Sequence, residues 1–399
     1  MKETTTEIQK ALAEVLPADL KKVGDDWEVV WGPVVWKNDP DASDTSYGNA
    51  WFVAKNENVV FEDGSKHCTY VVAIAGTSGI YDWIYEDLAI RQVVNMDAWA
   101  GPGAAAINKA PVPIPNNASA PSNEPLVTNG FAQAVYQLLN NSPPKGSPGY
   151  QSNLPEFLQS IHPDPSLPSL PKLVFTGHSL GGALSPTLAY ALLKSNCLGT
   201  FSSDMNNVYV YPTAGPSPGN AMFAQKFTKH FPHRTSSPDS SYKHWNVNIV
   251  NKLDIVPCGY CMDPEYNPEV LASILPMYGN TKYQVIGVWI AVEALKWAAR
   301  KLYIPIAFNL FDSPIPKPPT PPKNTWDFIQ DAHKYHVNAY TKEILGIDKP
   351  SKKPYLEREM DDWLSHPLLG HIATKQQEVE ANGGNVPEGI VEYDETAET

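Results

Sequence analysis

A serine in a glycine-containing motif is the residue of this chain whose neighbours most clearly indicate a catalytic role. Ser179 stands in the segment Gly177-His-Ser-Leu-Gly181, between the apolar run Leu173–Thr176 and the helix-forming run Leu180–Lys194. The pattern G-x-S-x-G between a strand and a helix predicts a sharp turn, with glycines where side chains would collide across it. The turn exposes the hydroxyl at a helix N-terminus, whose positive end stabilises a developing anion. We therefore expect Ser179 to be a nucleophile.

Two further groups must assist such a serine, because a free hydroxyl is a poor nucleophile. In chains with this strand-turn-helix motif, an acid and then a histidine follow the serine in sequence. Asp254 ends an apolar run and precedes Val256-Pro257, although by position alone an aspartate that caps a loop is the better interpretation. Beyond it, His333 and His336 both satisfy the order. His178, inside the motif, should point away from the serine hydroxyl.

Four blocks of the chain stand in a characteristic order. They are AGTSGIYDW at 75–83, GHSLGGAL at 177–184, YPTAGPSPGNAMFAQKF at 211–227 and VNKLDIVP at 250–257. Together they resemble the class 3 lipases, whose familiar members are fungal triacylglycerol lipases, from about Asn49 to Tyr340. The chain departs from the family pattern at the first block, where Ala75 stands in the place of a common arginine. The insert after that block is also long.

The resemblance implies an α/β-hydrolase fold and the hydrolysis of carboxylic esters without a metal or organic cofactor. It assigns the acid to Asp254, and it assigns one oxyanion donor to Thr77, whose backbone amide and hydroxyl can both donate. The backbone amide of Leu180, the residue after the nucleophile, is the second expected donor. The alternative role for Thr77 is a cap on the helix that follows it.

The identity of the base depends on where the last helix begins. Family members carry this histidine just before a short terminal helix, with an aromatic residue a few positions later. Four apolar residues recur at helical spacing near the end of the resemblance: Val337, Tyr340, Ile344 and Leu345. We therefore expect a helix to begin just after His336, which makes His336 the favoured base. His333, which lies in an aromatic stretch and could serve only in packing, remains the alternative, and His371 is a more distant one.

The elements that must position these residues form an α/β pattern. Strands alternate with helices in the second half of the chain, which favours a mostly parallel central sheet flanked by helices. We expect strands at Val29–Trp36, Asn49–Asn56, Thr69–Ala75, Leu173–Thr176, Val208–Gly215 and His244–Asn251, and helices at Ile80–Leu88, Gly130–Asn140 and Leu180–Lys194. Pro186 should bend the last of these helices. An amphipathic N-terminal helix should pack through Ile8, Leu12, Val15 and Leu16.

The same pattern predicts one α/β-hydrolase domain over residues 1–345. The segment from about 79 to 128 includes an Ala-, Pro- and Asn-rich stretch of low regularity, Val94–Val127, and long irregular segments of this kind are often lids or binding loops. We therefore expect this insert, together with the Ile80–Leu88 helix, to border or cover Ser179. Residues 346–399 should form a C-terminal extension with an acidic tail.

Composition excludes several other functions. The 399 residues are 42% hydrophobic and carry a formal net charge of −13, so the surface should repel nucleic-acid phosphates and lack attraction to anionic lipid head groups. The sequence contains no run of about 18 apolar residues, so we expect no integral membrane segment. No signal peptide is visible in MKETTTEIQKALAEVL, which makes a cytoplasmic location the default and leaves secretion open.

Cysteine usage leaves one local question open. Cys258 and Cys261 form a C-x-x-C pair, whereas Cys68 and Cys197 are single. A zinc ribbon needs two such pairs, so metal ligation is the weakest interpretation. A local disulfide between Cys258 and Cys261 is a stronger interpretation than metal ligation. The remaining interpretation is two thiols packed in a loop.

The sequence thus predicts a serine carboxylic-ester hydrolase that acts through an acyl-enzyme on acylglycerols or similar acyl esters, with transient contact at a lipid–water interface. Two alternatives remain. One is an esterase of narrow, non-lipid range, such as a feruloyl-type enzyme. The other is a non-catalytic binding protein on the same fold, since a fold does not determine a function.

Overall fold

The computed structural model describes residues 5–24, 26–37, 48–76, 90–116, 120–163, 170–235, 237–268 and 270–347. Where the sequence predicts one domain, the chain divides into two compact units. The first comprises Met1–Ser78, Ala89–Val250 and Leu302–Phe311, and the second comprises Gly79–Leu88, Asn251–Lys301 and Asp312–Thr399. Most of the predicted C-terminal extension lies outside the described residues.

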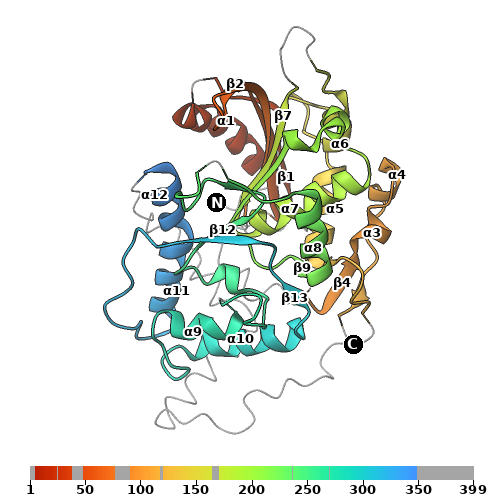
Figure 1. Cartoon of the computed structure of the whole chain (residues 1–399). Helices are drawn as coiled ribbons and strands as arrows, with labels where there is room; N and C mark the ends of the chain where they lie inside the picture. Colours follow the sequence, from red (N-terminus) through yellow and green to blue (C-terminus); the bar gives the residue numbers. More distant parts are fainter. Residues whose placement is uncertain are drawn as a thin grey trace. The chain divides into compact units, whose positions relative to one another are not determined.

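A seven-stranded sheet forms the centre of the first unit (Figure 1). Its strands, in spatial order, are β1 (Glu28–Trp36), β2 (Asn49–Val60), β3 (Lys66–Ile74), β7 (Lys172–His178), β8 (Val208–Thr213), β12 (Asn248–Asn251) and β14 (Phe308–Phe311). β3, β7, β8 and β12 pair in parallel, whereas β1 and β2 add antiparallel strands at one edge. The sheet is therefore mixed with a parallel centre, which places the carboxyl ends of β3, β7 and β8 at one edge.

Helices cover both faces of this sheet. Successive strand residues point to opposite faces, so Ala50 and Trp51 in β2 mark the two sides. Helix α1 (Thr5–Val23) packs on the Ala50 side through Ile8 and Leu12. On the other side, the Trp51 ring lies beside Trp31, which in turn contacts Phe157 of α6 (Leu154–Ser160). α5 (Asn129–Asn140) and α7 (Leu180–Lys194) pack against each other.

One predicted helix and one predicted strand are present with differences. The predicted N-terminal helix is present, but Val15 is 49% exposed and lies off its packed face. The strand predicted from His244 to Asn251 is divided into β11 (His244–Trp245) and β12, because Asn246 between them has a φ of 64°. α7 runs from Leu180 to Lys194 as one helix with Pro186 inside it.

The segment predicted to be irregular carries regular structure. It contributes β4 (Gln92–Asn95), β5 (Ile114–Pro115) and β6 (Leu126–Thr128) to a five-stranded sheet with β9 (Gly219–Asn220) and β13 (Tyr303–Ile304), and it adds α3 (Met96–Trp99) and α4 (Ala104–Ile107). The Asn95 side chain caps α3, and the paired residues Val94 and Val127 are almost fully buried. The prediction of low regularity was wrong because these strands gain their stability from distant partners rather than from local pattern.

The second unit is mainly helical. Its helices are α9 (Ile274–Met277), α10 (Ile286–Ala299), α11 (Thr325–His333) and α12 (Ala339–Leu345), with 3₁₀ turns η4 (Val256–Cys258) and η5 (Leu271–Ser273). A π-helical turn, η6 (Lys334–Asn338), joins α11 directly to α12 (Figure 1). Tyr278 packs against Phe328 and Tyr335 with ring centroids 4.9 and 5.3 Å away.

The remaining elements of the first unit are short. They are η2 (Gly199–Ser203), η3 (Met205–Asn207), α8 (Ala221–His230) and β10 (Arg234–Thr235). Among the described helices, none combines the length and apolarity needed to span a bilayer.

Candidate active site

The turn between β7 and α7 holds Ser179 in an unusual backbone conformation. Its φ is 61° and its ψ is −124°, a region that residues with a side chain rarely adopt. The turn is fixed on both sides, because the Ser179 amide donates to the Thr213 carbonyl at 3.0 Å and the Gly182 amide donates to the Ser179 carbonyl at 2.8 Å. Backbone strain of this kind is retained where the surroundings impose it, and it concentrates at functional sites.

Two glycines allow this turn to form. A Cβ atom at Gly177 would lie 2.4 Å from the carbonyl carbon of Gly181, and one at Gly181 would lie 2.3 Å from the Ile74 carbonyl oxygen. Both distances are far below van der Waals contact, so neither position accepts a larger residue without a backbone shift. The glycines thus have the steric role that the sequence pattern predicts for them.

Leu180 occupies the first position of α7, directly after Ser179. The first amides of a helix have no acceptor within the helix, so they point outward with the positive end of the helix dipole. An anion beside Ser179 would meet this end of α7. The geometry is compatible with Leu180 as an oxyanion donor.

The expected second donor, Thr77, lies outside the described residues, but its neighbour Gly76 is described. A Cβ atom at Gly76 would lie 2.7 Å from the His178 carbonyl oxygen and 3.0 Å from the Ser179 Cβ. The chain leaving β3 therefore passes in contact with the serine turn. This close approach is a feature that the sequence analysis missed, and the signal for it was the glycine next to the expected donor.

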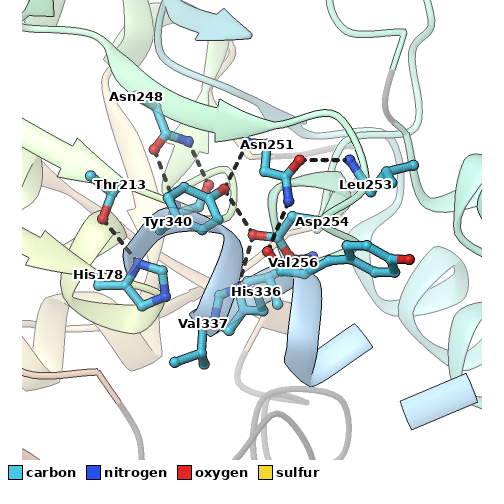
Figure 2. A network of polar contacts seen from close by, with 12 residues as sticks. His178, Thr213, Asn248, Asn251, Leu253, Asp254, Val256, His336, Val337 and Tyr340 are labelled. Atoms are coloured by element: carbon cyan, nitrogen blue, oxygen red, sulfur yellow. Dashed lines mark hydrogen bonds and ion pairs between the residues drawn. The ribbon is translucent and has the colours of Figure 1, made fainter. Parts of the chain in front are cut away.

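His178 is held on the sheet. Its Nδ1 lies 3.0 Å from the Thr213 hydroxyl oxygen at the end of β8 (Figure 2). This contact agrees with the expectation that its ring faces away from the serine hydroxyl.

Asp254 and His336 form a buried pair within the second unit. Asp254 Oδ2 lies 2.9 Å from His336 Nδ1 (Figure 2). The carboxylate is fully buried, and His336 is 3% exposed. A carboxylate facing Nδ1 favours the tautomer that carries its proton there, which makes Nε2 the basic nitrogen of the ring.

The Asp254 carboxylate accepts two further hydrogen bonds. The Val256 amide donates to Oδ1 at 3.0 Å, and the Tyr340 hydroxyl donates to Oδ2 at 2.9 Å. The Tyr340 oxygen in turn accepts a hydrogen bond from the Asn251 amide at 2.9 Å. Hydrogen bonds to a buried carboxylate favour its charged form and fix its direction. Tyr340 entered the sequence analysis only as a helix-face residue, and its polar role depends on these long-range contacts.

The loop after β12 is tied to the π-helical turn. The Asn251 side chain donates to the Tyr335 carbonyl oxygen at 2.9 Å and accepts from the Leu253 amide at 3.2 Å. These bonds hold the Asp254 loop against the turn that carries His336. Asn251 is a second positioning residue that the sequence analysis missed, because a buried asparagine has no distinctive local signal.

The predicted helix start after His336 was wrong. α11, η6 and α12 form one helical segment from Thr325 to Leu345, so His336 lies within a helical turn and not at a helix mouth. His336 lies in a π-helical turn, a feature that is rare in general and frequent at functional sites.

His336, of the two competing histidines, is the one that the structure pairs with Asp254. Burial, together with the nearby His336, lowers the pKa of His333 to about 4. His333 is therefore neutral at ordinary pH. The third candidate, His371, lies outside the described residues.

Two residues of the predicted lid contact the end of α7 that is remote from Ser179. Asp97 forms an ion pair with Lys194 at 3.2 Å, and the Gly103 amide donates to the Ser195 carbonyl at 3.0 Å. Both contacts are at the C-terminal end of α7, about 20 Å along the helix from Ser179 at 1.5 Å per residue. These two contacts join the insert to α7, and the expectation that the insert borders or covers Ser179 stays a prediction. The rest of the predicted cover, residues 77–89, is not among the described residues.

The four cysteines are buried thiols that form no disulfide. The local disulfide considered for Cys258 and Cys261 is therefore not formed, and these thiols pack in the loop around η4. In the described part of the chain, no three side chains of the types that ligate metals gather at one point.

Comparison with known proteins points to one family. The family model described as Lipase (class 3) matches residues 71–260. Among solved structures, the M37 lipase matches with a TM-score of 0.59 and 22% sequence identity over 90% of this chain and 92% of that chain. A propeptide complex of the Rhizomucor miehei lipase matches with a TM-score of 0.34 and 19% identity over 63% of this chain and 58% of that chain. A Yarrowia lipolytica lipase matches with a TM-score of 0.34 and 22% identity over 59% and 61%.

A search of curated protein sequences finds no match. The likeness to the M37 lipase shows a shared fold. With the mixed central sheet and the helices that cover it, this confirms the predicted α/β-hydrolase fold.

Proposed function

We propose, from the premise that this chain belongs to the class 3 lipase family, that it cleaves acyl esters with Ser179 as the nucleophile. The family makes the chain a carboxylic ester hydrolase. Acylglycerols or similar acyl esters are the proposed substrates, met at a lipid–water interface. The observation that carries the proposal is the strained conformation of Ser179, held between β7 and α7 by glycines that admit no side chain.

In the proposed mechanism, His336 accepts the Ser179 proton on Nε2 while Oγ attacks the ester carbonyl carbon. Asp254 holds the imidazole through Nδ1 and stabilises the imidazolium that forms. The bond between carbon and Oγ forms as the carbonyl π bond becomes an oxyanion, which the amides of Leu180 and Thr77 stabilise. Collapse of this intermediate expels the alcohol, which takes the proton from His336. Water then attacks the acyl-enzyme by the same steps and releases the acid.

The buried pair of Asp254 and His336 supports this assignment of roles. The carboxylate accepts hydrogen bonds from His336, Tyr340 and the Val256 amide, so its position and direction are fixed. An orienting acid needs a fixed position, because a mobile group would not hold the imidazole in one tautomer.

The test is the hydrolysis of a series of chromogenic p-nitrophenyl esters, from acetate to laurate, by the wild type and by Ser179→Ala. We expect the wild type to cleave these esters, and we expect the variant to lose at least about three orders of magnitude in kcat. A fluorophosphonate probe should label the wild type at Ser179 and leave the folded variant unlabelled.

The same series separates the alternatives. Cleavage of aliphatic esters supports the proposal, whereas cleavage confined to aryl-acid esters such as ferulates would indicate a narrow, non-lipid esterase. No cleavage of any ester, with Ser179 unlabelled, would favour a binding protein and contradict the proposal.

A further inference from the structure

The chain turns sharply after β8, at residues 213–215, and this β8 turn carries a backbone acceptor for Ser179. The Thr213 carbonyl accepts the hydrogen bond from the Ser179 amide at 3.0 Å. The next residue, Ala214, has a φ of 55°, a left-handed conformation that is unfavourable for a residue with a side chain. Such a conformation persists only where the surroundings impose it. The β8 turn therefore needs support of its own before it can hold the serine.

Gly215, the last residue of the β8 turn, packs closely against the helix that follows Ser179. A Cβ atom at Gly182 would lie 2.4 Å from the Thr213 carbonyl oxygen and 2.9 Å from the Gly215 Cα. A Cβ atom at Gly215 would lie 2.5 Å from the Gly182 carbonyl carbon. The Gly182 amide in turn donates to the Ser179 carbonyl at 2.8 Å. The β8 turn thus supports the serine backbone at two points, its amide directly and its carbonyl through Gly182.

The side chain of Asn248, on β12, holds the β8 turn. Its Oδ1 accepts from the Gly215 amide at 3.1 Å, and its Nδ2 donates to the Gly215 carbonyl at 2.8 Å (Figure 2). The Ala214 amide adds a backbone hydrogen bond to the Ile249 carbonyl at 3.0 Å. Asn248 is 4% exposed, and all of these residues lie in the first unit. One buried carboxamide therefore binds both backbone polar groups of Gly215 and fixes the peptide groups on either side of it.

We propose that Asn248 is a positioning residue for the nucleophile, an inference that rests on the proposed function of Ser179. Its two hydrogen bonds fix Gly215, and Gly215 confines Gly182, whose amide holds the Ser179 carbonyl. Thr213, in the same turn, holds the Ser179 amide. Asn248 thereby keeps the serine in the strained conformation that presents Oγ at the N-terminus of α7. It acts through the backbone and exchanges no proton in the reaction.

Loss of this support should change the geometry of attack. Ser179 is strained, so without the β8 turn in place its backbone relaxes and Oγ moves away from the ester carbonyl carbon. A displacement of about 1 Å costs up to about a hundredfold in rate. We therefore expect Asn248→Ala to lower kcat for p-nitrophenyl butyrate by about ten- to a hundredfold, with KM little changed.

Labelling of the full chain by a fluorophosphonate probe gives a second measurement. In this reaction the bond between Oγ and phosphorus forms, fluoride leaves, and the hydroxyl proton passes to the base. The rate constant of labelling therefore reports the reactivity of Ser179 without the later hydrolysis of an acyl-enzyme. We expect it to fall in Asn248→Ala by about the same factor as kcat. Both measurements are made well below the melting temperature of the variant, where a loss of stability alone would leave them unchanged.

Asn246 offers a matched control, because it supports the same strand in the same way. It is 1% exposed, its Oδ1 accepts from the Val210 amide at 2.8 Å, and its Nδ2 donates to the Pro232 carbonyl at 2.8 Å. Val210 lies in β8 about 10 Å along the strand before Thr213, at 3.3 Å per residue. Asn246→Ala should lower the melting temperature as Asn248→Ala does, whereas its kcat and its rate of labelling should equal those of the wild type.

The inference is overturned if folded Asn248→Ala keeps the wild-type kcat and rate of labelling, or if Asn246→Ala loses as much of both. If Asn248→Ala does not fold, Asn248→Asp decides. A carboxylate keeps an acceptor for the Gly215 amide but has no donor for the Gly215 carbonyl, so we expect the same two losses. Wild-type rates in that variant would overturn the inference as well.

These outcomes are distinct from a failure of the proposed function. Where the wild type cleaves the ester and is labelled at Ser179, the proposed function stands whatever the asparagine variants do. A wild type that neither cleaves esters nor reacts with the probe would contradict the proposed function, and the role of Asn248 with it.

Discussion

Tyr340 donates its phenol proton to Asp254 Oδ2 at 2.9 Å, the same oxygen that His336 Nδ1 approaches to 2.9 Å. The tyrosine and the histidine lie four positions apart, on the π-helical turn and the helix that follows it. One stretch of helix therefore supplies both the group that Asp254 orients and a donor that orients Asp254.

Tyr340→Phe removes one hydrogen bond from the buried carboxylate. A hydrogen bond to a charged group contributes about 1.5–3 kcal/mol, so we expect kcat to fall at least about tenfold with KM little changed. Steady-state kinetics on a short-chain ester measure this. Tyr335→Phe is the control, because its hydroxyl donates to the Pro316 carbonyl and not to Asp254. An equal loss of kcat in both variants would show that Tyr340 acts only through stability.

Substitution of His336 and of His333 should have different effects on kcat. His336→Ala removes the ring that contacts Asp254, so we expect kcat on a short-chain ester to fall by at least about three orders of magnitude. His333→Ala should retain more than about a tenth of the wild-type kcat, provided that circular dichroism shows a folded chain. The reverse pattern, with His336→Ala active, would transfer the role of the base to His333.

His333 should also make the stability of the chain depend on pH. Its pKa is about 4 in the folded chain and 6.5 in the unfolded one, so the unfolded state binds more protons between these values. The free energy of unfolding should therefore rise with pH from about 4 to about 6.5 and level off above, by at most about 3 kcal/mol from this group.

His333→Gln should flatten this part of the profile, as measured by urea unfolding at several pH values. An unchanged slope in the variant would assign the pH dependence to other groups.

Gly181→Ala should disrupt the serine turn. The added Cβ would lie 2.3 Å from a backbone oxygen of β3, which cannot yield as a side chain can. We expect a loss of about 1–3 kcal/mol in stability or more, and loss of activity with it. Gly101→Ala is the matched control, because the nearest atom to its added Cβ is 3.9 Å away. Thermal melting of both variants compares them, and a normal melting temperature for Gly181→Ala would contradict the steric role of this glycine.

The local sequence pattern was sufficient to predict the parts of the protein that depend on neighbouring residues in the chain. The turn at Ser179 follows from an apolar run, closely spaced glycines and a helix-forming run, because steric exclusion across a tight turn involves only near neighbours. The α1 helix follows from its helical period, and six strands of the central sheet follow from their β-branched and aromatic residues, whereas β14 was not predicted. Asp254 could be named only with the help of the family resemblance, and the candidate histidines from their order along the chain.

Tertiary structure decided whatever depends on distant partners. The short strands β4 and β6 have too few residues to show a period, and they exist because they pair with each other and with β9. The choice of His336 as the partner of Asp254, and the bond from Tyr340, require a π-helical turn that no local pattern marks. The hydrogen bonds from Asn248 to Gly215 likewise form only when β12 lies beside β8, because contacts between residues far apart in sequence depend on packing between elements and not on any one of them.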